Sequence, residues 1–264
     1  MHRLLVLPAT LLMCALLALL ALFALAWNVL AWPLLVLLPG ERGVAVGRWG
    51  IAHGYRLFWS IASASGLIRF DARALDVLRD EPGLIIAANH PSLLDAPLLL
   101  ARLPRSACIM KAALMRHPLV GGAARLARYI ANDSPHGMVR QAVAMLRRGE
   151  QLVMFPEGTR TTEPPVNRFR AGVALIAKLA PAPVQAVFID TDSPYLGKGW
   201  PPWRLPPLPI RFTVRLGKRF AAPHDSELLL QQLEHYFAAG VRPPSRPAPA
   251  AGVAAVAHRE PRSG

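Results

Sequence analysis

The first forty residues of this chain constrain its fold more than any other feature of the sequence. The 36 residues from Leu4 to Pro39 carry no charge, since the nearest charged side chains are Arg3 and Glu41. A helix needs about 20 apolar residues to cross the hydrocarbon core of a bilayer. One crossing fits easily and two short ones only just, so we expect residues 1–40 to hold the chain to a membrane.

Aromatic residues and prolines mark the end of this apolar segment. The pattern predicts one helix from about Thr10 to Leu30, with Trp27 at the level of the lipid headgroups and a break near Trp32 caused by Pro33. A secretory signal peptide cleaved near residues 24–26 is the competing interpretation. It fits less well because the apolar run is far longer than the 7 to 15 residues of the apolar region in a typical signal peptide.

Apolar runs and helical patterns alternate along the middle of the chain, which predicts an α/β domain. We expect an open mixed sheet flanked by helices, with an N-terminal transmembrane or interfacial helical segment. The predicted strands are 83–88, 107–111, 151–155 and 184–189, with an edge strand at 210–216. The predicted helices are 44–62, near the bilayer interface, and 91–103, 119–128, 134–148, 170–179 and 226–239.

These elements divide the chain into three predicted parts. Residues 1–40 form the membrane-anchoring segment and residues 41–240 form one folded domain. Residues 241–264 are dominated by proline and alanine, which cannot build a core, so we expect them to be disordered.

Two short polar clusters follow predicted buried strands, and both carry side chains suited to chemistry. In residues 89–95 an aspartate, Asp95, follows His90 at a spacing that lets it hold the imidazole proton on one nitrogen. In residues 155–160 a glycine lets backbone approach a ligand closely, and the guanidinium of Arg160 can fork onto a phosphate. Both clusters fall at carboxyl ends of strands, where ligands gather in open α/β sheets.

The order of these clusters, 67 residues apart, gives a family resemblance over residues 80–220. The chain resembles the glycerolipid acyltransferases, which include 1-acylglycerol-3-phosphate acyltransferases and carry an N-H-x-S-x-x-D block followed by F-P-E-G-T-R. Those blocks stand here as Asn89 to Asp95 and Phe155 to Arg160. The resemblance implies an O-acyltransferase that moves a fatty acyl group from acyl-CoA or acyl carrier protein to the hydroxyl of a lysophospholipid, without a cofactor.

The same resemblance assigns roles to individual residues. His90 is the expected general base, with Asp95 as its orienting partner. Arg160 is the expected main ligand of the acceptor's phosphate, in a substrate-binding loop with the three residues before it, Glu157, Gly158 and Thr159. We expect Glu157 to orient Arg160 rather than touch the phosphate. Lys111, at a predicted strand end, either adds a cation to the site or is an ordinary solvated lysine.

Other side chains near the clusters have simpler interpretations. We expect Ser92 to cap a helix start, because no nucleophile elbow surrounds it, and Asn89 to cap or position its turn. A metal held by His90, Asp95 and Glu157 is not required by their spacing, and the family does not use one. Of the two cysteines, Cys108 is expected to be a small core residue, and no disulfide is implied.

Two departures from the family pattern concern the acceptor. Asp133 stands where the second family block commonly ends in an arginine, and Ala186 stands at a usual proline of the fourth block. A doubly charged phosphomonoester is best held by several cations. A less acidic lysolipid, or another hydroxyl acceptor, therefore remains open as the substrate.

The net charge of +14 indicates the remaining partners. A basic surface attracts anionic lipids and phosphorylated substrates, whereas no nucleic-acid-binding motif is present. The arginines at 42, 48 and 56 predict a bacterial-type inner membrane location with the domain facing the cytoplasm, although a hairpin with both ends inside stays possible. The tryptophans in residues 197–204 suggest an interfacial contact or packing onto the domain. The rival functions are a membrane-anchored hydrolase and a non-catalytic lipid-binding protein.

Overall fold

The computed structural model describes residues 2–117, 121–201 and 203–242, and its centre is a seven-stranded sheet. The strands lie in the order β1-β7-β6-β2-β5-β3-β4, and all neighbours are parallel except β6 and β7. The strand bounds are β1 Ile68–Asp71, β2 Ile85–Ala88, β3 Ser106–Met110, β4 Ile130–Ala131, β5 Gln151–Met154, β6 Val184–Thr191 and β7 Ile210–Phe220. The predicted mixed sheet is therefore confirmed.

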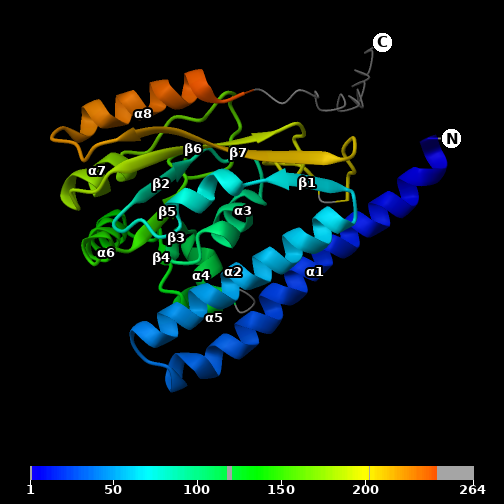
Figure 1. The fold of residues 1–264 in the computed structure, drawn as a ribbon, viewed down its shortest axis with the longest axis horizontal. Coiled ribbons are helices and arrows are strands. Elements are labelled where there is room, and N and C mark those ends of the chain that lie inside the picture. The colour runs from blue at the N-terminus through cyan, green and yellow to red at the C-terminus, as the bar shows by residue number, and fades with distance from the viewer. Residues whose placement is uncertain (1, 118–120, 202, 243–264) are drawn as a thin grey trace, which may run out of the picture.

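Helices flank this sheet (Figure 1). Helices α1 and α2 form a long hairpin that packs against α3 and α5, and α6 packs against α7, which in turn packs against α8. Their bounds are α1 His2–Leu37, α2 Glu41–Ala64, η1 Arg73–Leu78, α3 Asp95–Arg102, α4 Ala112–Arg116, α5 Gly121–Leu126, α6 Pro135–Arg147, α7 Gly172–Leu179 and α8 Ser226–Gly240.

Helix α1 is longer than predicted. The expected break near Trp32 is wrong, because Pro33 lies inside the helix and Leu38 still donates its amide to the carbonyl of Leu34 at 2.9 Å. Packing of Ala31 against Leu126 of α5 holds this part of α1 in place. The chain turns instead at Gly40, whose φ of 78° is a conformation that favours glycine.

One side of α1 is part of the domain core. Met13 and Leu16 belong to the main hydrophobic cluster, although Leu7–Leu37 is also apolar and long enough to cross a membrane. The other side exposes large apolar side chains, which include Leu11, Leu22 and Val36. The helix thus packs one face against the protein and leaves another face exposed.

Helix α2 confirms the predicted helix at 44–62 and explains its glycines. A Cβ on Gly47 would lie 2.7 Å from the amide nitrogen of Ala127, and one on Gly50 would lie 2.1 Å from the ring of Trp27. Glycine therefore allows α2 to approach both α1 and α5 closely. Trp59 is buried in the core, whereas Trp49 is 56% exposed.

Arg48 ties α2 to the segments that follow α3, α5 and α6. Its guanidinium donates to the carbonyl oxygens of Ala127 and Arg105 at 3.0 and 2.8 Å and pairs with the carboxylate of Glu150 at 2.6 Å. The side chain is only 7% exposed. The charge of Arg48 therefore serves the packing of the domain. Because it is buried, it does not support the orientation that we predicted from the arginines after the apolar segment.

Two other predictions about elements need correction. The strand predicted at 210–216 is not an edge strand, because β1 pairs with the other side of β7. β1 has only four residues, too few to show a pattern in the sequence. The helix predicted from Pro91 begins at Asp95 instead, because residues 91–94 form a turn in which Asp95 donates its amide to the carbonyl of Ser92. The predicted disorder at 241–264 lies almost wholly outside the described residues.

Candidate active site

The two polar clusters meet because β2 and β5 are adjacent parallel strands. Ala87 of β2 is paired with Met154 of β5, so the turns that follow these strands leave the same edge of the sheet side by side. The imidazole of His90 stacks on the ring of Phe155, with centroids 4.0 Å apart and planes 18° from parallel. The amide of Thr161 donates to the carbonyl of His90 at 2.8 Å. Clusters 67 residues apart in sequence thus form one site.

His90 and Asp95 are in direct contact. Nδ1 of the imidazole lies 2.7 Å from Oδ2 of Asp95, which also accepts the amide N–H of Ser92 at 2.7 Å. An ionised Asp95 can only accept, so Nδ1 carries the proton and Nε2 keeps its lone pair. The His90 side chain is 18% exposed and the Asp95 side chain is 0% exposed. This arrangement gives a base that is open to a substrate and oriented from within the protein.

Two opposing effects act on the pKa of Asp95. Burial raises the pKa of Asp95, and the hydrogen bonds from His90 and Ser92 oppose that rise by favouring the carboxylate. Its Oδ1 atom is buried and has no hydrogen-bond partner among the described residues. The negative charge is therefore stabilised mainly through Oδ2, the atom that faces His90.

Glu157 does not orient Arg160, which corrects the prediction. Its Oε1 accepts the backbone amide of His90 at 2.9 Å and the hydroxyl of Thr161 at 2.9 Å, and its Oε2 accepts the amide of Asn167 at 2.8 Å. The residue is 2% exposed, and burial raises its pKa against the effect of these bonds. Glu157 therefore fixes the backbone that carries His90.

Arg160 is held by main-chain carbonyls from another part of the chain. Its Nη1 donates to the carbonyl oxygens of Leu196 and Gly197 at 2.7 and 3.1 Å. Its charge acts to lower the pKa of Asp95, and the next residue, Thr161, donates its backbone amide to the carbonyl of His90. The carbonyls leave other guanidinium N–H groups able to bind an anion.

The remaining predicted substrate-binding residues lie around this turn. Gly158 has a φ of 70°, a conformation that favours glycine, and Thr159 is half-buried beside it. Lys111 directly follows β3, the strand next to β5, and is exposed. Asp133 is also exposed, after β4. The roles of Thr159 and Lys111 in binding remain predictions.

Asn89 and Ser92 both support the turn rather than react. The amide group of Asn89 donates to the carbonyl of Ile189 and accepts the amide of the same residue, which joins β2 to β6. The hydroxyl of Ser92 donates to the carbonyl of Tyr195 at 3.0 Å. Ser92 is not the residue that caps α3, since the N-cap is Leu94. Its bond to Tyr195 gives it a different structural role from the one predicted.

Within the described residues, no group of three histidine, cysteine, aspartate or glutamate side chains could hold a metal ion. Cys108 is buried, as predicted for a core residue, and burial raises the pKa of its thiol to about 12.

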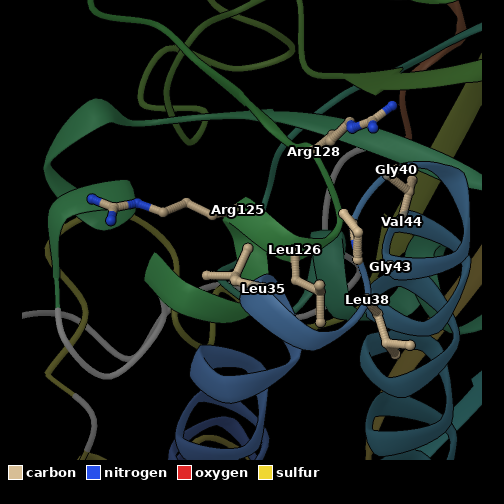
Figure 2. A pocket seen from close by; sticks show the side chains of 9 residues that line it. Leu35, Leu38, Gly40, Gly43, Val44, Arg125, Leu126 and Arg128 are labelled. Atoms are coloured by element: carbon tan, nitrogen blue, oxygen red, sulfur yellow. The ribbon is translucent and has the colours of Figure 1, made fainter.

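One cavity lies at the helical hairpin and another beside α5 and α6, and His90, Asp95 and Arg160 line neither of them. A cavity of about 90 Å³ opens at the turn between α1 and α2, and Figure 2 shows Leu35, Leu38 and Leu126 gathered there. A larger one of about 420 Å³ is bordered by four arginines at positions 48, 125, 128 and 148. Two of these, Arg48 and Arg148, pair with Glu150. Neither cavity is part of the candidate site.

Comparison with known proteins gives relatives that are acyltransferases by name. The acyltransferase family model matches residues 69–190, a range that contains both polar clusters. A lyso-ornithine lipid O-acyltransferase of Pseudomonas aeruginosa is 31% identical over 153 residues, which are 53% of this chain and 58% of that relative. A 1-acyl-sn-glycerol-3-phosphate acyltransferase of the same organism is 25% identical over 184 residues, 67% of this chain and 70% of the relative.

A solved structure confirms the fold over nearly the whole chain. The crystal structure of the 1-acyl-sn-glycerophosphate acyltransferase PlsC from Thermotoga maritima is similar with a TM-score of 0.67 and 20% identity, covering 91% of this chain and 96% of that one. The similarity includes the region of α1 and α2, which the family model does not reach. The relatives with acyltransferase names and this shared fold together bear out the resemblance to glycerolipid acyltransferases.

Sequence reasoning missed the segment that completes the site. Leu196 and Gly197 contact Arg160 through carbonyl oxygens, which every residue possesses, so no side-chain pattern could reveal them. Phe155 was part of the recognised cluster, but its stacking on His90 had not been predicted. An aromatic residue directly after a strand, level with the histidine of the neighbouring strand, is the signal that could have indicated it.

Proposed function

We propose that this protein is a membrane-bound O-acyltransferase that moves a fatty acyl group from an acyl thioester to the hydroxyl of a lysophospholipid, with 1-acylglycerol-3-phosphate as the acceptor. The single observation that carries the proposal is the 2.7 Å contact between His90 Nδ1 and buried Asp95, with the other ring nitrogen left free. Two relatives with acyltransferase names support the reaction class, and one of them names this acceptor.

The proposed transfer is direct and uses no acyl-enzyme. Nε2 of His90 takes the proton of the acceptor hydroxyl as its oxygen attacks the carbonyl carbon of the thioester. Asp95 stabilises the imidazolium that forms. The carbon–sulfur bond then breaks, and the leaving thiolate takes the proton from His90. This last proton transfer returns His90 to its neutral starting form.

Arg160 is the proposed ligand of the acceptor's phosphate. It lies in the same electrostatic environment as Asp95, and a guanidinium matches the geometry of phosphate oxygens. Lys111 is proposed as a further cation at the same edge of the sheet. The donor in this proposal is acyl-CoA or acyl carrier protein, whose phosphate and acidic groups suit the basic domain.

We place the protein at the cytoplasmic side of a bacterial-type inner membrane. The exposed apolar face of α1 supports contact with lipid acyl chains, and the exposed Arg42 at the start of α2 supports the cytoplasmic orientation. The acceptor is itself a membrane lipid, so contact with the bilayer would bring it to the domain.

A different lysolipid is the second candidate acceptor. The lyso-ornithine lipid O-acyltransferase is a relative with higher identity than the phosphate-specific one, and Asp133 stands where the family commonly has an arginine. Lipids with a smaller negative charge need fewer cations than a phosphomonoester.

Purified protein in lipid vesicles tests these alternatives. Labelled acyl-CoA and labelled acyl carrier protein are supplied separately with a panel of lysolipids, and the products are identified by mass spectrometry. A labelled diacyl product is expected, and its headgroup identifies the acceptor. Release of free fatty acid without an acceptor would make the protein a hydrolase, and absence of turnover with every donor and lysolipid would leave only a lipid-binding role.

A further inference from the structure

The segment from Ser193 to Pro201, here called the β6 loop because it follows β6, touches both halves of the candidate site. The Leu196 carbonyl accepts the amide of Leu93 at 3.0 Å and the guanidinium of Arg160 at 2.7 Å. The hydroxyl of Ser92 is bonded to the carbonyl of Tyr195 in the same loop. The β6 loop therefore forms a third side of the site, next to the turns that follow β2 and β5. It lies outside both family blocks.

The conformation of this loop is tightly determined. The amide of Gly197 donates to Pro194 at 2.9 Å, and the amide of Trp200 donates to Gly197 at 3.1 Å. A Cβ on Gly197 would lie 2.9 Å from the carbonyl oxygen of Pro194, so a side chain there would force a shift. Leu196 has a φ of 57°, a strained value for a leucine that the surrounding bonds maintain.

Lys198 is the next residue after a carbonyl that binds Arg160. The Gly197 carbonyl accepts from Nη1 of Arg160 at 3.1 Å, so the backbone of Lys198 begins beside the guanidinium. Lys198 is exposed, and in the described parts of the chain no carboxylate forms an ion pair with it. Its flexible four-carbon stem lets an ammonium reach an anion bound at Arg160.

The charge of the proposed acceptor favours a second cation beside Arg160. A phosphomonoester carries close to two negative charges at neutral pH, and Arg160 supplies one positive charge. The second family block, which commonly supplies an arginine, has the exposed Asp133 here. A cation from the β6 loop would supply the positive charge that the arginine of the second family block supplies in other members.

We infer that Lys198 is a specificity-determining residue of the acceptor site and binds the acceptor's phosphate together with Arg160. This inference rests on the proposed acyltransferase function. It assigns the choice among acceptor headgroups to the β6 loop, which sequence analysis had connected only with the membrane interface or with packing.

The test compares Lys198→Gln with Lys178→Gln in the full-length protein. Lys178 is an exposed lysine in the last turn of α7, which leads into the opposite end of β6 from the site. Lys198→Gln is expected to raise KM for 1-acylglycerol-3-phosphate by about tenfold, the effect of losing one charge-assisted hydrogen bond. KM for a singly charged lysophosphatidylglycerol should rise less, kcat and KM for the donor should stay near wild type, and Lys198→Arg should restore binding.

Equilibrium binding of 1-acylglycerol-3-phosphate to the same variants separates the two proposals. Weaker binding by Lys198→Gln alone supports the role of Lys198 even if the wild-type protein transfers no acyl group, in which case only the proposed function fails. An active wild-type enzyme whose Lys198→Gln variant keeps the KM and affinity of the wild type, or loses no more than Lys178→Gln, overturns the inference and leaves the function standing. Absence of binding by the wild type refutes both.

Discussion

The backbone amide of His90 donates to Oε1 of Glu157 at 2.9 Å across 67 residues of sequence. This bond connects the turn after β2 to the turn after β5, and it is made by a carboxylate that has almost no exposure to solvent. The position of the His90 ring is therefore set from two sides. Asp95 fixes its Nδ1 atom, and Glu157 fixes the main chain from which the ring projects.

Glu157→Gln should show a pH-dependent loss of stability. Glu157 has a raised pKa in the folded protein, so the folded state binds its proton more tightly than the unfolded state does. Its contribution to stability is therefore greatest below the unfolded pKa of about 4.3 and falls as pH rises through the folded pKa. The difference in Tm between wild type and variant, measured by circular dichroism, should shrink between about pH 4 and neutral pH. A difference that widens over this range would contradict the assigned direction.

His90→Ala should abolish transfer. Loss of a general base costs about 10²- to 10⁴-fold in rate, so the variant should keep no more than about a hundredth of the wild-type kcat. His224→Ala is the matched control, because His224 is exposed in the loop before α8. Retention of more than about a tenth of wild-type kcat by His90→Ala would show that another group accepts the proton.

Asp95→Asn should leave the fold in place while removing most of the activity. An amide at this position can offer an N–H to Nδ1, which favours the wrong imidazole tautomer, and the corresponding change in a known catalytic triad costs about 10⁴-fold in kcat. A kinetic assay with saturating donor and acceptor measures the loss, and circular dichroism checks folding. A folded variant with near-normal kcat would exclude a role for Asp95 in orienting His90.

Arg160→Lys should weaken acceptor binding specifically. Lysine keeps the positive charge but loses the fork that can hold both the carbonyls of the β6 loop and a phosphate. We expect KM for the acceptor to rise by about tenfold, with little change in KM for the donor. Arg168→Lys, an exposed position in the neighbouring loop, is the control. Equal effects of both changes would argue against a phosphate site at Arg160.

Arg48→Ala should destabilise the domain without touching the site. Removal of one partner of a buried ion pair costs about 3–5 kcal/mol, and Arg148 also pairs with Glu150, so we expect a loss of about 3 kcal/mol. Arg42→Ala, at an exposed position of the same helix, should change the free energy of unfolding by less than about 0.5 kcal/mol. Urea unfolding measures both, and a loss below about 1 kcal/mol for Arg48→Ala would rule out its structural role.

The parts of the structure that could be predicted are those coded in local patterns. The strands that precede both clusters were predicted within two residues, because buried parallel strands are short apolar runs with clear ends. The meeting of His90 and Asp95 followed from their spacing at a turn. β1 was not predicted because four residues are too few for their alternation in polarity to stand out. Without β1, β7 was wrongly expected to lie at the edge of the sheet.

The contacts of Glu157 show why the partners of the site side chains could not be predicted from the sequence. Glu157 and Arg160 are three residues apart, which suggested that they interact. The left-handed conformation of Gly158 lies between them, and each side chain finds its partners in a different segment. Those partners are mostly main-chain amides and carbonyls, whose positions depend on the complete fold.

The side chain of Asn28, in the middle of the apolar helix α1, accepts the amides of Gly122 and Ala123 at 2.7 and 3.3 Å. A polar group at that depth would be costly in lipid, and here it is satisfied by the domain itself. Helix α1 and the domain therefore share hydrogen bonds and one hydrophobic core, and α1 is not a separate appendage. Proteolytic removal of α1 is therefore not expected to yield a soluble, active domain, because the core residues that α1 covers would become exposed to water.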